Sequence, residues 1–399
     1  MVIFNPFVPS YRVSPYRQLA RLRASEPVHR SGALQAWICT SYDACLRILR
    51  EPEVFSSDAR HARGQLADAL QEQRRISPLG ETRTVLTSDP PDHTRLRGIV
   101  NRAFTTRRVA ELRPRIEEIT ASLLDALPRG GEFDLMAALA QPLPVIVIAE
   151  LLGVPATDRE RFRHWSNAIA QTTSLIQSDA IRGEARAATG ELVAYFDAIV
   201  AERRRSPRAD LLSALVEAED EGRRLTHDEV LAFAILLLVA GNETTTNLLG
   251  NGMLALLAHP DQLALLRQRP ELRAAAIEEM LRWDSPVQGV VRFTTAETTV
   301  GGVPLASGDI VLAMVGAANR DAAQFADADR FDITRSDDRH LSFGIGPHFC
   351  LGAPLARLEA DVAFAALLER FPALRAGDGV TERGGTFLLR GPSRVSLEA

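Results

Sequence analysis

The chain has 399 residues, of which 46% are hydrophobic and 24% are charged, values typical of a globular protein with a large core. Its formal net charge of −5 gives no reason to expect nucleic acid as a partner. All 46 basic residues are arginine, so the chain lacks the lysine that pyridoxal enzymes and P-loop proteins require.

The three cysteines, Cys39, Cys45 and Cys350, argue against a disulfide framework and indicate a reducing cytosol. No basic start followed by an apolar run opens the sequence, so we expect no signal peptide. The most apolar stretch, residues 231–240, is too short to cross a membrane and predicts a buried helix. We therefore expect a cytoplasmic protein without a membrane anchor.

The hydrophobic pattern predicts a mainly α protein with a minor β part, in one domain over residues 1–399. A long helix begins after Thr226, which with Glu229 forms a capping box, and runs to about Ala258. The irregular segment 56–88 is long enough to be a functional lid. The other predicted elements are a strand at 36–40, a helix at 42–50, helices through most of 92–216, a helix at 270–283, short strands within 290–315, a helix from Cys350 to about 370, and a hairpin at 386–397.

Cys350 lies in the glycine-rich stretch FGIGPHFCLG. Three interpretations are open from these residues: a buried structural cysteine, a nucleophile with His348 as its base, or a metal ligand. Gly344, Gly346 and Gly352 allow close backbone approach and positive φ. A helix starting after Cys350 would direct its first amides at the sulfur.

The longer stretch FGIGPHFCLGAPLARLE resembles the haem-binding loop of the cytochrome P450 family, through Phe343, Gly346, His348, Cys350 and Gly352. The resemblance covers essentially the whole chain. It implies the cytochrome P450 fold, with haem b held between the long central helix and this loop. It also implies that Cys350 is the axial thiolate of the haem iron and that Phe343 packs beside the sulfur.

The stretch LVAGNETTTN lies in the long helix, although glycine and threonine are poor helix formers. Thr244 can donate to the carbonyl of Ala240, four residues earlier, and so bend the helix. The segment resembles the oxygen-activation motif of the same family in Ala240, Gly241, Glu243 and Thr244. That resemblance implies that Glu243 and Thr244 deliver the protons needed to cleave the O–O bond.

Glu279 and Arg282, in EEMLRW, can share one helix face. As an isolated pair they would be a weak surface salt bridge. They also match the family's Glu-x-x-Arg pair, which implies a buried structural network completed by an arginine from a later turn. The stretch DADRFDITR resembles that turn, and Arg330 is the candidate.

His93 and Arg97 are spaced to share one helix face, where two cations repel unless an anion lies between them. They could form an ordinary solvated basic face. The resemblance instead implies that they bind the haem propionates together with Arg292 and His348.

Family positions also imply a substrate pocket formed by the segment 57–88, the helices around 162–177, and the residues Val239, Val287, Val290, Val291 and Phe387. These positions are mostly apolar, which favours an organic substrate. Four arginines, Arg102, Arg107, Arg108 and Arg357, could form a basic surface for an acidic ferredoxin.

The resemblance implies a monomeric monooxygenase that uses O2, with electrons from NAD(P)H through ferredoxin reductase and ferredoxin. Its substrate would be a free or carrier-tethered compound of secondary, antibiotic-type metabolism. Three alternatives remain: atypical chemistry on the same fold, such as peroxygenation, coupling or dehydration; a haem-binding protein without turnover; and a cysteine hydrolase using Cys350.

Overall fold

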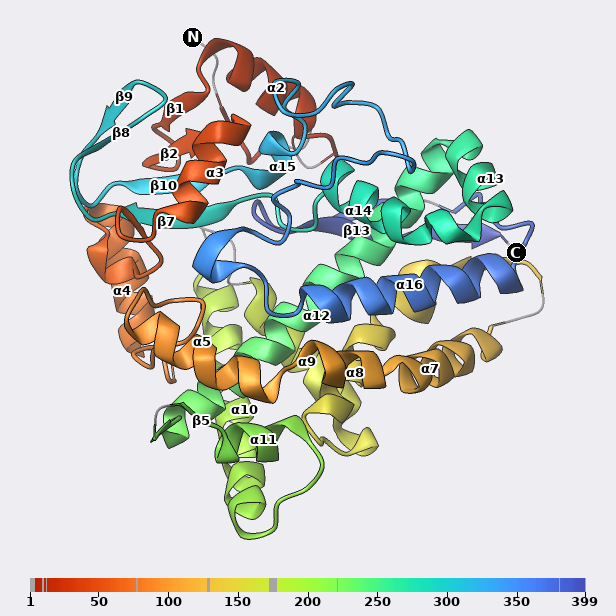
Figure 1. Cartoon of the computed structure of the whole chain (residues 1–399), viewed down its shortest axis with the longest axis horizontal. Coiled ribbons are helices and arrows are strands. Elements are labelled where there is room, and N and C mark those ends of the chain that lie inside the picture. The colour runs from red at the N-terminus through yellow and green to blue at the C-terminus, as the bar shows by residue number, and fades with distance from the viewer. Residues whose placement is uncertain are drawn as a thin grey trace.

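The computed structural model describes the chain except for residues 1–3, 9–10, 12, 77, 128–129, 172–177, 221, 380 and 399. Within the described residues, a large group of helices packs beside a smaller part that contains the main sheet (Figure 1). The prediction of a mainly α protein with a minor β part is confirmed.

The main sheet has five strands in the order β1-β2-β10-β7-β3. Their bounds are β1 Val28–Ser31, β2 Ala36–Cys39, β10 Ile310–Ala313, β7 Val290–Thr294 and β3 Phe55–Ser56. Strand β10 runs parallel to β2 and antiparallel to β7. Its Ile310 and Leu312 pack into one core cluster, and Val311 and Ala313 pack into another. Because both faces of this strand are covered, all its residues are apolar.

Helices form most of the remaining structure, and α12 runs through their middle (Figure 1). Their bounds are α2 Tyr16–Ser25, α3 Tyr42–Arg50, α4 Gln65–Ile76, α5 Asp92–Ala103, α6 Thr106–Glu111, α7 Arg113–Asp125, α8 Pro142–Leu151, α9 Arg159–Ala170, α10 Asp179–Arg205, α11 Leu211–Glu217, α12 His227–Ala258, α13 Pro260–Gln268, α14 Arg273–Trp283, α15 Val315–Ala318 and α16 Ala353–Arg370.

Helix α12 has the predicted start and end. The Thr226 hydroxyl accepts from the Glu229 N–H at 3.2 Å, and the Glu229 carboxylate accepts from the Thr226 N–H at 2.8 Å. Helices α8, α9, α10, α14 and α16 pack against it, so it is apolar on most faces. Among the described helices, α12 alone is long and apolar enough to cross a membrane. Because other helices pack around it, its apolar composition is that of a core helix.

The segment 56–88 is more ordered than predicted. It contains the short 3-10 helix Ala59–His61 and the twelve-residue helix α4. Asp68 in the first turn of α4 and Arg74 and Arg75 in its last turn complement the helix dipole. The expectation of irregular backbone is therefore wrong for the middle of this segment, where charge placement supports a helix despite weak apolar periodicity. Its role as a lid stays a prediction.

The C-terminal hairpin begins earlier than predicted. Strand β12 (Glu382–Gly385) pairs with β13 (Arg390–Arg394), and the predicted start at Thr386 lies in the turn between them. Strand β14 (Ser396–Glu398) leaves the hairpin and pairs with β4 (Glu132–Asp134) and β11 (Arg375–Ala376). Two minor hairpins complete the described strands. One pairs β8 (Thr298–Val300) with β9 (Val303–Leu305), and the other pairs β5 (Glu219–Asp220) with β6 (Arg223–Arg224).

Candidate active site

The glycine-rich turn before Cys350 packs against the end of α3. Gly344 and Gly346 have positive φ angles of 67° and 73°, as predicted. A Cβ on Gly346 would lie 3.2 Å from the carbonyl oxygen of Leu49, so a side chain there would be crowded. The expectation of positive φ at Gly352 is wrong, because this residue caps α16 with an ordinary φ of −80°.

Cys350 lies between this turn and the first residue of α16, Ala353. Its N–H donates to the carbonyl of Phe343 at 2.8 Å, which closes the turn. Burial raises the pKa of the Cys350 thiol, while the amides at the start of α16 and the charges of Arg97 and Arg357 act to lower it. These groups therefore stabilise a thiolate only in part. A metal cation bound to the sulfur would supply the remaining stabilisation.

Four groups that can carry positive charge converge beside the Cys350 loop. His93 and Arg97 come from α5, Arg292 from β7 and His348 from the loop itself. The ring centroids of His93 and His348 are 4.2 Å apart. Burial, together with Arg292 and His93, lowers the pKa of His348 to about 3. Burial lowers the pKa of Arg292 to about 10, and burial and Arg97 lower the pKa of His93.

Little in the described part of the chain balances this positive charge. The His93 Nε2 atom is buried without a hydrogen-bond partner among the described residues. The His348 Nε2 atom lies 3.1 Å from the Ser57 hydroxyl. Asp89 acts on both His93 and Arg292, but one of its oxygens already accepts from the Ser57 N–H at 2.9 Å. The two propionates of a haem fit this cluster, because they would restore the charged forms that burial and repulsion disfavour.

The middle of α12 leaves open space at two small residues. Thr244 Oγ1 donates to the Ala240 carbonyl at 2.7 Å, as predicted, and the segment remains helical. Ala240 is exposed. A Cβ added to Gly241 would have Ile148 Cδ1, 3.8 Å away, as its nearest neighbour. The bend expected at this point stays a prediction.

Glu243 and Asn242 have contrasting surroundings. The Glu243 Oε2 atom is buried without a hydrogen-bond partner in the described part of the chain, and burial raises its pKa to about 7. Asn242 is also buried, but its amide donates to the Ser166 hydroxyl at 2.9 Å and its oxygen lies 3.4 Å from the Thr246 hydroxyl. Asn242 therefore joins α12 to α9, a role that was not predictable from the sequence because Ser166 is 76 residues away.

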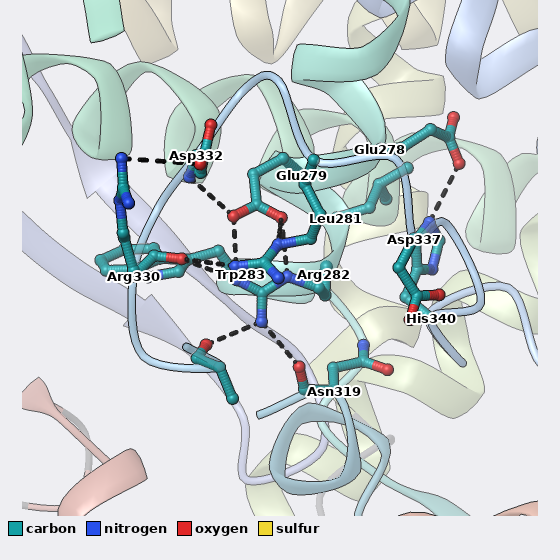
Figure 2. Close-up of polar contacts among 12 residues, drawn as sticks. Glu278, Glu279, Leu281, Arg282, Trp283, Asn319, Arg330, Asp332, Asp337 and His340 are labelled. Carbon is teal, nitrogen blue, oxygen red and sulfur yellow. Dashed lines mark hydrogen bonds and ion pairs between the residues drawn. The ribbon is translucent and has the colours of Figure 1, made fainter. Parts of the chain in front are cut away.

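Glu279 and Arg282 form a buried bidentate pair (Figure 2). Arg282 donates to the Glu279 carboxylate through Nε at 2.6 Å and Nη2 at 2.9 Å. It also donates to the carbonyl oxygens of Asn319 and Ala328, both at 2.8 Å, and of Arg330 at 3.0 Å. These bonds join α14 to the loop that precedes the Cys350 turn.

The arginine that joins this pair is Arg335, not Arg330. Arg335 Nε lies 3.2 Å from Glu279 Oε2, and its side chain is 12% exposed. The Arg330 side chain is 64% exposed and lies 3.6 Å from the Asp332 carboxylate, so only its carbonyl contributes (Figure 2). The prediction was wrong because both arginines lie in DADRFDITR, where irregular backbone gives no period to show which side chain points inward.

The predicted pocket residues lie at several half-buried places. Val290 and Val291 precede Arg292 on β7. Val287 forms a bridge with Leu389 in the turn of the C-terminal hairpin. In the same turn, Phe387 packs against Phe4 and Tyr11, with ring centroids 6.0 and 5.9 Å away. Val239 is half-buried beside Ala240 on α12. Residues 172–177 of the predicted pocket lie outside the described residues, and the pocket stays a prediction.

The four arginines of the predicted ferredoxin surface differ in their surroundings. Arg102, Arg107 and Arg108 are exposed on α5 and α6. Arg357 on α16 is half-buried and donates to Glu278 at 2.6 and 2.7 Å. This pairing was not predictable from the sequence, because Glu278 and Arg357 are 79 residues apart.

Comparisons with known proteins agree with this fold. The cytochrome P450 family profile matches residues 49–396. Cytochrome P450 107B1 of Saccharopolyspora erythraea is 45% identical over 392 residues, which cover 96% of this chain and 94% of that protein. The solved structure of the Bacillus subtilis bacillaene polyketide synthase cytochrome P450 PksS is 38% identical, with a TM-score of 0.90 and 99% of both chains covered. P450BioI, solved in complex with a hexadec-9Z-enoic acid ligated acyl carrier protein, is 34% identical, with a TM-score of 0.89 over 98% of this chain and 99% of that one.

These matches define a haem enzyme of mainly helical fold. The chain belongs to the cytochrome P450 family. Relatives are named as monooxygenases and hydroxylases, and this protein is an oxidoreductase of the same kind.

Proposed function

We propose that the chain, as a single monomeric domain over residues 1–399, is a cytoplasmic monooxygenase. It inserts one atom of O2 into an organic substrate and reduces the other to water. Two electrons for each turnover come from NAD(P)H through ferredoxin reductase and ferredoxin. The observation that carries the proposal is the convergence of His93, Arg97, Arg292 and His348 beside the half-buried Cys350 thiol, where burial and neighbouring positive charge disfavour the charged forms of the two histidines.

Haem b bound at this site supplies the iron at which dioxygen is activated and its O–O bond is cleaved. Cys350 would hold the haem iron as a thiolate, which the amides at the start of α16 help to stabilise. His93 and Arg97 on α5, Arg292 on β7 and His348 in the cysteine loop would hold the haem through its two propionates.

Glu243 and Thr244, on α12, move protons in this proposal. The pKa of Glu243 is raised to about 7 by burial, so near neutral pH its Oε2 can both hold and release a proton. The Thr244 hydroxyl donates to the Ala240 carbonyl, which leaves its oxygen free to accept a hydrogen bond. A carboxyl and a hydroxyl in series can therefore supply the two protons that O–O cleavage consumes.

The substrate we propose is a largely apolar natural product of secondary metabolism. The half-buried valines Val239, Val287, Val290 and Val291, together with Phe387, favour an apolar molecule. The likeness to PksS supports a compound of polyketide type, and the acyl carrier protein bound to P450BioI supports a carrier-tethered form.

The first experiment is the absorption spectrum of the reduced, CO-treated protein. We expect the Soret band of thiolate-ligated haem in the wild type and its loss in Cys350→Ser. Turnover is then compared with redox partners and with peroxide alone. We expect Thr244→Ala to consume O2 without forming the matching amount of product. A missing thiolate band, or turnover with peroxide only, would contradict the proposal.

A further inference from the structure

A second polar cluster lies beside Phe343 of the Cys350 loop, and the function proposed above gives no role to its carboxylate, Glu278. The Glu278 carboxylate on α14 accepts from Arg357 Nε at 2.6 Å and Arg357 Nη2 at 2.7 Å. Its Oε2 atom is also 3.0 Å from His340 Nε2 (Figure 2). The His340 side chain is 3% exposed, so water screens this cluster only in part.

Arg357 connects the cluster to the cysteine loop. Its guanidinium lies over the ring of Phe343, with Cζ 4.5 Å from the centroid. Phe343 in turn accepts the backbone hydrogen bond from Cys350 at 2.8 Å. The charge of Arg357 also acts on the Cys350 thiol, whose deprotonated form it favours. The cation therefore lies close enough to affect the electron density on the sulfur.

The geometry indicates which members of the cluster are charged. The Ser342 N–H donates to His340 Nδ1 at 3.3 Å, so Nδ1 is an acceptor and the ring proton is on Nε2, facing Glu278. Burial alone would raise the pKa of Glu278, but hydrogen bonds from Arg357 and His340 outweigh it and hold the pKa at about 2. The carboxylate of Glu278 and the guanidinium of Arg357 carry opposite unit charges, which largely cancel.

We infer that Glu278 is a positioning residue that neutralises Arg357 behind Phe343 and so lowers the reduction potential of the haem iron. Reduction adds one electron to the iron, and nearby positive charge favours that step. With Glu278 in place, the field of Arg357 is largely cancelled and the oxidised state is favoured. The inference depends on the proposed ligation of haem by Cys350.

The experiment measures the reduction potential of the intact holoenzyme by spectroelectrochemical titration. Glu278→Gln leaves Arg357 uncompensated, and we expect a shift to more positive potential. Arg357→Gln leaves Glu278 uncompensated, and we expect a shift to more negative potential. The double variant should return towards the wild-type value, because both charges are absent. A purely structural role for the pair would move all three variants in the same direction.

Asp361→Asn is the matched control. Asp361 accepts from Arg273, so this pair also joins α16 to α14, but Asp361 lies about 6 Å further along α16 than Arg357. We expect no shift in that variant. Shifts of the same sign in Glu278→Gln and Arg357→Gln, or none, would overturn the inference. A wild type without the thiolate Soret band would instead overturn the proposed function.

Discussion

Carboxyl groups in the interior of this protein differ in whether an arginine side chain pairs with them. Glu279 is 1% exposed and is paired with both Arg282 and Arg335. Glu359 is also buried and Glu243 is half-buried, and in each the Oε2 atom is buried without a hydrogen-bond partner among the described residues. Burial alone raises their pKa values, to about 7 and about 8. Glu243 has a proposed role that explains this, whereas Glu359 on α16 has none.

Glu359 should make the stability of the protein depend on pH. With a folded pKa of about 8 against an ordinary value of about 4.3, the folded state keeps a proton that the unfolded state loses. Stability is therefore retained below pH ~4.3 and is lost as the pH rises to ~8. Glu359→Gln cannot ionise, so we expect its free energy of unfolding to exceed that of the wild type by an amount that grows through this range.

Urea unfolding at several pH values measures that difference. Each pKa unit corresponds to about 1.4 kcal/mol, so the gain at alkaline pH should be several kcal/mol. Glu369→Gln is the control, since Glu369 is exposed on the same helix. A difference between wild type and Glu359→Gln that is constant with pH would show that Glu359 does not titrate as described.

At the scale of elements, the loop between α15 and the cysteine turn is held mainly by side chains from α14. Arg282 donates to three of its carbonyl groups, and the Asp332 N–H donates to Glu279 at 2.8 Å. Ala328 supplies one of those carbonyls.

Replacing Arg335 should cost more than replacing Arg330. Arg335→Gln removes a buried cation from Glu279, and we expect a loss of about 2–4 kcal/mol, somewhat below a fully broken buried pair because Arg282 remains. Arg330→Gln removes an exposed side chain, and we expect a change within about 0.5 kcal/mol. Chemical denaturation of both variants, monitored through the haem absorption, compares their free energies of unfolding. Equal losses would restore Arg330 as the third member of the network.

At the scale of the whole molecule, both ends of the chain meet at Asp284, just after α14. Asp284 Oδ1 accepts from the Tyr16 hydroxyl at 2.7 Å and from Arg390 Nε at 2.8 Å. Arg390 also donates to the Val13 carbonyl at 3.0 Å, across 377 residues of sequence. The start of the chain, the end of α14 and the C-terminal hairpin are thus joined by one buried carboxylate.

Loss of this carboxylate should loosen both ends together. Asp284 is 4% exposed, so Asp284→Asn leaves Arg390 buried without its counter-charge, and we expect a loss of about 3–5 kcal/mol. Limited proteolysis followed by mass spectrometry should show faster cleavage in both the first 20 or so residues and the hairpin β12–β13. Asp329→Asn is the control, because that side chain is 76% exposed. Faster cleavage at only one end would contradict the joint role.

Helices with strong local patterns were predictable from the sequence. The capping box at Thr226 and Glu229 and the apolar run that follows determine α12, since these contacts join residues only three or four positions apart. The hydrogen bond from Thr244 to Ala240 follows the same rule. Helix α4 was not predicted because its sequence is rich in charged residues and has only a weak apolar periodicity.

The sequence by itself was enough to predict the family, through the resemblance carried by FGIGPHFCLG, and that resemblance named Cys350 as the candidate ligand. The family is confirmed by the profile match over residues 49–396. Only the tertiary structure decided that Arg335 replaces Arg330, that Glu278 neutralises Arg357, and that Asp284 joins the two ends of the chain. The physical reason is distance along the chain. Local contacts leave a periodic pattern in the sequence, whereas a charge meets a partner 62 or 79 residues away only after the helices have packed.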